Sequence, residues 1–90
     1  MKIKDGFVLE EVGSSFIAVA VGKRADDFSG LVRLNSTGAF FWNAMKDNDI
    51  SRDALVDKIL SSYEGVSRDV VEADVDAFID KLLGAGILLA

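Results

Sequence analysis

The sequence predicts an α+β domain in which a small antiparallel sheet is followed by helices. In the first third of the chain, β-branched and aromatic residues flank short Gly/Ser turns, as they do in strands. Farther along, the apolar residues recur at three- and four-residue spacing, as they do on one face of a helix. Strands followed by helices favour helices on one face of a small sheet. The 90 residues, half of them hydrophobic, suffice for one core, so we expect a single domain over 1–90.

Three strands are expected before the first helix. Residues 7–12 and 15–21 flank Gly13-Ser14, which is a hairpin signal. A third short strand covers residues 31–34, contains no proline and has Arg33 as its single charge. If the hairpin occupies one side of this strand, the other side is free. An extended peptide, a covering loop or a second copy of the chain could then pair with it.

Three helices are expected after the strands. We expect each to begin at a residue whose side chain accepts hydrogen bonds from the free N–H groups of the first turn. Two of the helices should end at glycines, because glycine adopts the left-handed conformation of a C-terminal cap at no steric cost. We expect Gly65 to end the second helix, and Gly84 with Gly86 to end the third. The N-terminal caps are Asn35 or Ser36 for the first helix, Ser51 for the second and Ser67 for the third.

The composition leaves little room for catalysis. The chain has no cysteine and no histidine, which excludes thiol nucleophiles, disulfides, zinc sites of the usual kind and histidine acid–base chemistry. The acidic pairs Asp26-Asp27 and Asp47/Asp49 lack the further oxygen ligands and the terminal glutamate of a calcium loop. We therefore expect no enzyme activity, no metal and no cofactor.

The net charge of −5 lies entirely in the second half of the chain. Residues 1–45 carry five basic and five acidic side chains, whereas residues 46–90 carry five basic and ten acidic ones. A negatively charged domain is unsuited to nucleic acid or to an anionic membrane surface. No apolar run has the length of a membrane span, and no hydrophobic signal core follows the first lysines. We expect a cytoplasmic protein.

The third helix combines an apolar face with a line of acidic residues along one border of that face. Two interpretations stay open at this point. The helix is a core helix with an ordinary solvated side, or it forms an apolar groove whose negative edge suits a peptide carrying Lys or Arg. The apolar face comprises Val71, Val75, Phe78, Ile79, Leu82 and Leu83, and the acidic line comprises Asp69, Glu72, Asp76 and Asp80.

The segment Leu31-Val32-Arg33-Leu34-Asn35-Ser36-Thr37-Gly38-Ala39 with the following Trp42 resembles the strand-to-helix junction of the PqqD-like proteins, the coenzyme PQQ synthesis protein D family. The similarity covers nearly the whole chain in the right order. Later parts of it are Leu55-Val56, Ile59-Leu60, Tyr63, Asp74-Val75-Asp76-Ala77-Phe78, Leu82 and Gly86-Ile87-Leu88.

The resemblance implies a winged-helix-like domain of three strands and three helices that is not an enzyme. Members of this family and the related RiPP recognition elements bind the leader segment of a ribosomally made precursor peptide and present it to a modifying enzyme, often a radical-SAM protein. The leader pairs with the third strand as an added strand, in the cleft with the third helix. Carried over to this chain, the peptide-binding residues are Gly30, Leu31, Val32, Arg33, Leu34, Val71, Glu72, Val75, Asp76, Ile79 and Leu83.

The chain departs from the PQQ synthesis members at two places. The first strands lack an arginine-rich start, and Asp47-Asn48-Asp49 stands in place of an Asp-Gly turn. These departures favour a peptide pathway other than PQQ synthesis. The alternatives to a leader-binding adaptor are a winged-helix DNA-binding protein, which the acidic second half disfavours, and a homodimerisation module in which the free strand pairs with its twin.

Overall fold

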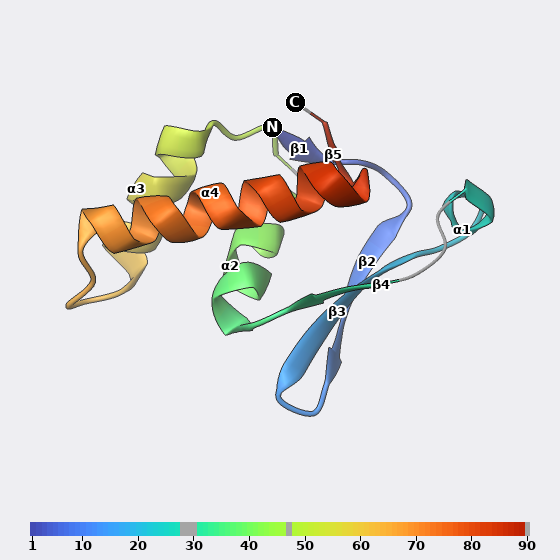
Figure 1. Cartoon of the computed structure of the whole chain (residues 1–90), viewed down its shortest axis with the longest axis horizontal. Coiled ribbons are helices and arrows are strands. Elements are labelled where there is room, and N and C mark those ends of the chain that lie inside the picture. The colour runs from blue at the N-terminus through green and yellow to red at the C-terminus, as the bar shows by residue number, and fades with distance from the viewer. Residues whose placement is uncertain (28–30, 47, 90) are drawn as a thin grey trace.

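A three-stranded sheet and three long helices form the frame of the domain (Figure 1). The computed structural model describes residues 1–27, 31–46 and 48–89. The order of strands and helices confirms the predicted α+β class. The described elements are β1 (Lys2–Ile3), β2 (Phe7–Val12), β3 (Ser15–Ala20), α1 (Arg24–Asp27), β4 (Leu31–Leu34), α2 (Ser36–Met45), α3 (Arg52–Ser62), α4 (Arg68–Ala85) and β5 (Leu88–Leu89).

The main sheet is antiparallel, with the strand order β2-β3-β4. Its hairpin turns at Gly13, whose φ of 63° is left-handed, while no residue other than glycine has a positive φ in the described part of the chain. A glycine in this conformation at the first of two turn residues is typical of a type II′ turn, whose twist matches that of the strands. The hairpin and the strand over 31–34 are as predicted from the sequence.

The two faces of the sheet differ in what they contact, because successive side chains of a strand point to opposite faces. Ala18 at the centre of β3 is fully buried and lies opposite Leu9 on one side and Val32 on the other. These residues, with Phe16 and Leu34, pack into the core. The opposite face of the sheet carries Val8, Glu10, Ile17, Val19, Leu31 and Arg33.

All three predicted N-terminal caps are present. The Asn35 side chain accepts a hydrogen bond from the Gly38 N–H over 2.8 Å. Ser51 does the same for the Ala54 N–H over 3.1 Å. Ser67 accepts from Val70 over 3.4 Å. Each cap satisfies one of the N–H groups that a helix start leaves without a partner.

The helix ends differ in part from the prediction. Helix α3 stops at Ser62, before Gly65, because its C-cap Tyr63 is extended (φ −127°, ψ 138°). The Tyr63 ring makes an edge contact with Phe40, with ring centroids 5.5 Å apart. Gly65 is left-handed as expected (φ 75°), but it lies in the loop after the helix. Gly86 ends α4 with a φ of 77°, whereas Gly84 lies inside the helix and does not close it.

Three short elements were not predicted from the sequence. The short helix α1 follows β3, in a segment for which no helix was expected. Strands β1 and β5 pair near the two ends of the chain, with Lys2 opposite Leu89 and Ile3 opposite Leu88 (Figure 1). Two-residue strands carry too little periodic signal to be recognised. Ile3 and Leu88 face each other in this pair, and both side chains are buried in the core, which holds the two strands together.

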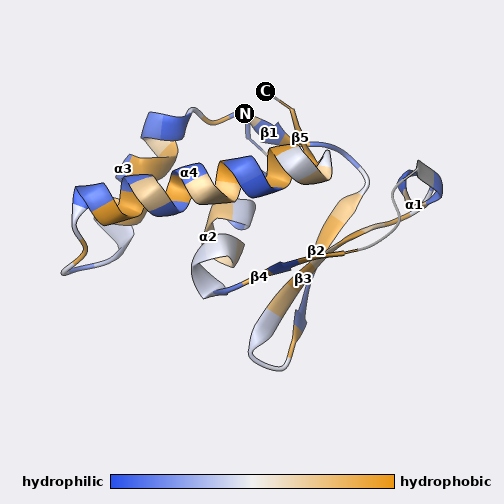
Figure 2. Cartoon of the chain, in the orientation of Figure 1, coloured by the Kyte–Doolittle hydropathy of each residue, from blue (hydrophilic) through white to orange (hydrophobic). Residues whose placement is uncertain are grey.

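The core lies between the helices and the inner face of the sheet, with α2 at its centre. Phe41, Trp42 and Met45 of α2 are almost fully buried, and the Phe41 ring lies 5.2 Å from that of Phe78 on α4. Figure 2 shows apolar residues spread along the strands and striped along α4. Among the described helices, none has both the length and the hydropathy needed to cross a membrane.

Candidate functional site

The outer edge of β4 presents main-chain groups that do not pair within the sheet. Val12 and Ser15 flank the two-residue turn, so they form a hydrogen-bonded pair and Ser15 directs its N–H and C=O toward β2. Direction alternates along a strand, so Phe16 and Ala18 direct theirs toward β4.

The same alternation fixes the orientation of β4. Leu34 and Val32 lie opposite Phe16 and Ala18, and their N–H and C=O groups therefore bond to β3. Leu31 and Arg33 direct theirs to the other side. Among the described residues, no strand pairs with that side of β4.

Helix α4 lies beside this edge. The Lys81 ammonium donates a hydrogen bond to the main-chain carbonyl of Arg33. This contact agrees with the outward orientation of that carbonyl. It also makes Lys81 the side chain that joins the third strand of the sheet to the last helix.

A groove of about 230 Å³ lies where β4, the start of α2 and α4 meet. Buried phenyl rings contribute its apolar part, while one acidic and one basic side chain come from α4. We refer to it as the β4–α4 groove. It is lined by Leu34, Asn35, Thr37, Gly38, Phe41, Asp74, Ala77, Phe78 and Lys81.

The residues predicted on the third strand lie at this edge. The side chains of Val32 and Leu34 are buried on the core face, whereas those of Leu31 and Arg33 are exposed on the opposite face. This strand can therefore offer its main chain, rather than most of its side chains, to a peptide. Gly30 lies outside the described residues.

The residues predicted on the third helix are not brought together on one surface. Val71 and Val75 are buried in the core, and Ile79 packs against it in part. Leu83 is exposed, yet it does not line the β4–α4 groove. The groove is instead walled by Asp74, Ala77, Phe78 and Lys81.

The sequence contains a pattern that places these groove residues together on α4. Asp74, Phe78 and Lys81 follow one another at steps of four and three, so they lie on one side of the helix. That side borders the apolar face opposite to the acidic line. The helical period alone does not say which border faces the strand.

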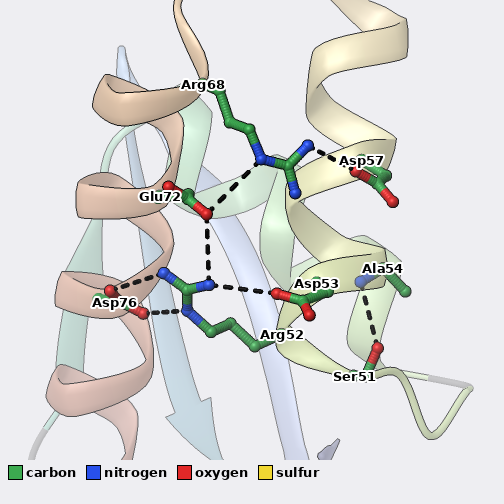
Figure 3. Close-up of polar contacts among 8 residues, drawn as sticks. All are labelled: Ser51, Arg52, Asp53, Ala54, Asp57, Arg68, Glu72 and Asp76. Carbon is green, nitrogen blue, oxygen red and sulfur yellow. Dashed lines mark hydrogen bonds and ion pairs between the residues drawn. The ribbon is translucent and has the colours of Figure 1, made fainter.

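Two members of the acidic line, Glu72 and Asp76, lie on the side of α4 that contacts α3 and pair with Arg52 of α3 and Arg68 of α4 (Figure 3). Arg52 binds Asp76 through two hydrogen bonds, Nε to Oδ1 at 2.6 Å and Nη2 to Oδ2 at 2.9 Å. Its Nη1 lies 3.6 Å from Glu72, which lies at the same distance from Arg68 Nε. We refer to these four residues, two arginines and two carboxylates, as the α3–α4 seam.

Hydrogen bonding in the seam shifts the protonation equilibria of Arg52 and Asp76. The bond from Arg52, aided by its positive charge, holds the pKa of Asp76 below its usual 3.8. The same bond raises the pKa of Arg52. Two further carboxylates, both on α3, contact the same arginines. Asp53 Oδ1 lies 3.2 Å from Arg52 Nη1, and Asp57 Oδ1 lies 3.1 Å from Arg68 Nη1. The carboxylates of the seam are thus occupied by the chain's own arginines.

The described part of the chain contains no group of three acidic side chains placed to hold a metal ion.

Comparison with known proteins identifies one family and one fold. The family model for Coenzyme PQQ synthesis protein D (PqqD) matches residues 6–88. A solved structure titled "TbiB1 in Complex with the TbiA(beta) Leader Peptide" is similar to this chain with a TM-score of 0.72 and 23% sequence identity. The match covers 98% of this chain and 94% of that one, and it shows a shared fold. No curated protein sequence matches the chain.

Proposed function

Because the chain belongs to the PqqD family, we propose that it is a non-catalytic adaptor for a ribosomally made precursor peptide. It binds the leader segment of that precursor and presents the peptide to a modifying enzyme, in the manner of a RiPP recognition element. TbiB1, which shares the fold, is described as a complex with a leader peptide. The observation that carries the proposal for this chain is the free edge of β4 beside the β4–α4 groove.

The leader binds by adding a strand to β4. Its main-chain groups pair with the outward N–H and C=O of Leu31 and Arg33, which the register leaves available. Alternate side chains of an added strand point to the same face. Every second leader residue therefore points toward the groove, where Phe41, Phe78 and Ala77 offer apolar contact.

Lys81 has to adjust when the leader binds. The carbonyl of Arg33 accepts from the Lys81 ammonium in the free protein, and the added strand needs the same carbonyl as an acceptor. We propose that a leader N–H displaces the ammonium or shares the carbonyl with it. The released Lys81 then lies at the rim of the groove, on the same side of α4 as Asp74.

The proposed peptide-binding set is accordingly narrower on α4 than the sequence suggested. Glu72 and Asp76 act within the α3–α4 seam, and Val71 with Val75 supports α4 from the core. The binding residues on α4 are those that line the groove. Gly30 stays part of the proposal because it directly precedes β4 in the sequence, whereas Ile79 and Leu83 do not line the groove and are not part of the narrower set.

The receiving enzyme follows from the family. We propose a modifying enzyme of the radical-SAM kind, acting on a peptide other than the PQQ precursor. Precursor peptides are made on ribosomes, so the proposed place of action is the cytoplasm. A short precursor gene and a radical-SAM gene beside the gene for this chain would support this assignment.

The binding site is tested by chemical-shift mapping. The probe is a synthetic leader segment of the precursor encoded beside this chain, and a scrambled peptide of the same composition is the control. We expect amide shifts in residues 31–34 and 74–81 together with the authentic leader alone. Shifts confined to α3, or equal shifts with the scrambled peptide, contradict the groove.

A further inference from the structure

The face of the sheet turned away from the core is apolar and exposed. Its side chains come from all three strands, and several are β-branched. Val8 on β2 is 38% exposed and Leu31 on β4 is 56% exposed, and both flank Val19 of the central strand, so the apolar side chains are contiguous across the sheet. The proposed function uses the main chain of β4 and the opposite face, so it leaves these side chains without a role. We refer to Val8, Glu10, Ile17, Val19, Leu31 and Arg33 as the outer face.

Two rows cross the outer face. In the first row, Val19 of β3 lies between Val8 of β2 and Leu31 of β4. This row is apolar from one edge of the sheet to the other.

The second row has an apolar centre and opposite charges at its ends. Ile17 lies opposite Glu10 on one side and Arg33 on the other. Each charge is about one strand spacing, roughly 4.8 Å, from the centre. Neither Glu10 nor Arg33 forms an ion pair with any residue that the structure describes.

We propose that the outer face binds the outer face of a second copy of this chain. Consider a two-fold axis that lies in the interface and runs parallel to β3. It leaves each position along the strands unchanged and exchanges β2 of one copy with β4 of the other. Glu10 then faces Arg33 of the second copy, and Arg33 faces its Glu10. Ile17 faces its own equivalent.

The apolar row matches under the same operation. Val8 faces Leu31 of the second copy, and Val19 faces Val19. Two sheets that pack face to face in nearly aligned orientation lie about 10 Å apart, with their side chains interdigitated. In a two-fold interface, the same patch of both copies is in contact, as it is here.

The charges select this axis over the alternative. A two-fold axis in the interface that is perpendicular to the strands and crosses this row would place Glu10 against Glu10 and Arg33 against Arg33. Such an axis midway between the two rows would place each charge against an apolar side chain of the other row. Like charges in contact across an interface oppose association. Only the axis along β3 pairs opposite charges at both ends of the row.

The dimer is compatible with peptide binding. The outer face uses side chains that project from the plane of the sheet, whereas an added strand uses the edge of β4 in that plane. The face of a three-stranded sheet is small. The surface that the dimer buries is therefore at or below roughly 1,200 Å², the range of weak and transient complexes. We therefore expect a reversible dimer that dissociates on dilution.

The test uses charge exchange on the full chain, followed by sedimentation velocity at several concentrations. Glu10→Arg creates two repulsive pairs in the homodimer, each of two positive charges. Arg33→Glu also creates two repulsive pairs, each of two negative charges. We expect each single variant to self-associate at least tenfold more weakly than the wild-type chain. An equimolar mixture of the two should associate as tightly as wild type, because every facing pair is then opposite in charge. The variant carrying both changes should also regain self-association.

Net charge separates this mechanism from general repulsion. Glu10→Arg lowers the magnitude of the net charge from −5, so it would strengthen association if overall charge were the cause. Ile17→Glu gives an independent test, since it places two carboxylates against each other on the axis. Circular dichroism checks that each variant is folded. A wild-type chain that stays monomeric at millimolar concentration overturns the proposal, and so does a mixture of the single variants that fails to associate.

Discussion

The two sides of α4 use charged residues in opposite ways. On the side facing α3, the carboxylates of Glu72 and Asp76 are held by Arg52 and Arg68. On the side facing β4, Lys81 contacts a main-chain carbonyl at an open edge, and Asp74 has no ion-pair partner among the described residues. One side is closed by side-chain pairing and the other is open to a ligand.

The difference shows that the number of charged residues on a helix does not tell how many of them can still bind a ligand. The acidic line is the strongest electrostatic feature of the helix in the sequence, yet two of its members are neutralised by arginines, Arg52 of α3 and Arg68 at the start of α4 itself. Paired groups hold two helices together, whereas main-chain groups with no strand beside them are free to bind a peptide.

The largest expected effects come from proline on β4 and separate folding from binding. Val32→Pro removes a donor to β3 at a buried position, so we expect loss of the folded state. Arg33→Pro removes only an outward donor and places a ring at the free edge. It should leave the fold intact and weaken leader binding at least about tenfold, or ~1.4 kcal/mol. Circular dichroism and calorimetric titration distinguish the two variants.

Arg33→Ala is the matched control for the edge, because it removes the same side chain but keeps the N–H. Its leader affinity should stay within about twofold of wild type, well below the effect of losing a main-chain bond. Equal losses for Arg33→Ala and Arg33→Pro would mean that the side chain, and not the edge, binds the leader.

The α3–α4 seam should affect stability and leave leader binding unchanged. Arg52 lowers the pKa of Asp76, so the ionised carboxylate stabilises the folded state at neutral pH. This contribution is fully present above the usual value of 3.8 and disappears as pH falls through the lowered pKa. We expect Asp76→Asn to reduce Tm by a few degrees at pH 7, with the difference shrinking below about pH 4.

Asp80→Asn is the control for the seam, since Asp80 belongs to the same acidic line but has no ion pair among the described residues. Its Tm should match that of the wild type. A loss of leader affinity in Asp76→Asn at pH 7 would show that the two sides of α4 are not independent.

A smaller effect is expected from Lys81. Lys81→Met removes the ammonium that occupies the Arg33 carbonyl, so the leader no longer has to displace it. Affinity should increase about threefold, in line with one exposed hydrogen bond. Lys58→Met on α3 is the comparison and should leave the titration unchanged. Weaker binding by Lys81→Met would mean that the lysine contacts the leader itself.

The smallest expected effect is the salt dependence of leader binding. The groove contains one acidic and one basic side chain, and the seam is internally neutralised. Affinity should therefore change by less than about threefold between low salt and 0.5 M NaCl. A larger decrease of leader affinity with salt would indicate that the acidic line takes part in leader binding.

Local signals in the sequence were sufficient for much of the fold. The caps Asn35, Ser51 and Ser67 hydrogen-bond to groups three residues away, so their roles depend on neighbours along the chain. The turn at Gly13 is equally local. Gly65 shows the limit: its conformation was predicted, but the helix ended earlier because Tyr63 packs on Phe40 of another helix.

The candidate site was predicted in part. The free strand over 31–34 follows from the order of strands, and the involvement of the last helix follows from the family resemblance. The helix wall was assigned to the acidic border because charge is visible in a sequence. Asp74 and Lys81 on the other border were missed, since their position depends on how α4 is rotated against α3 and β4.

The amino-acid sequence by itself determined the order of strands and helices, the caps and the apolar faces, because each of these depends on periodicity or on residues a few positions apart. Only the tertiary structure decided that β1 pairs with β5, that Arg52 occupies Asp76, and that Lys81 reaches Arg33. These contacts join residues 24 or more positions apart. They depend on the rotation of packed elements, which a helical or strand period leaves free.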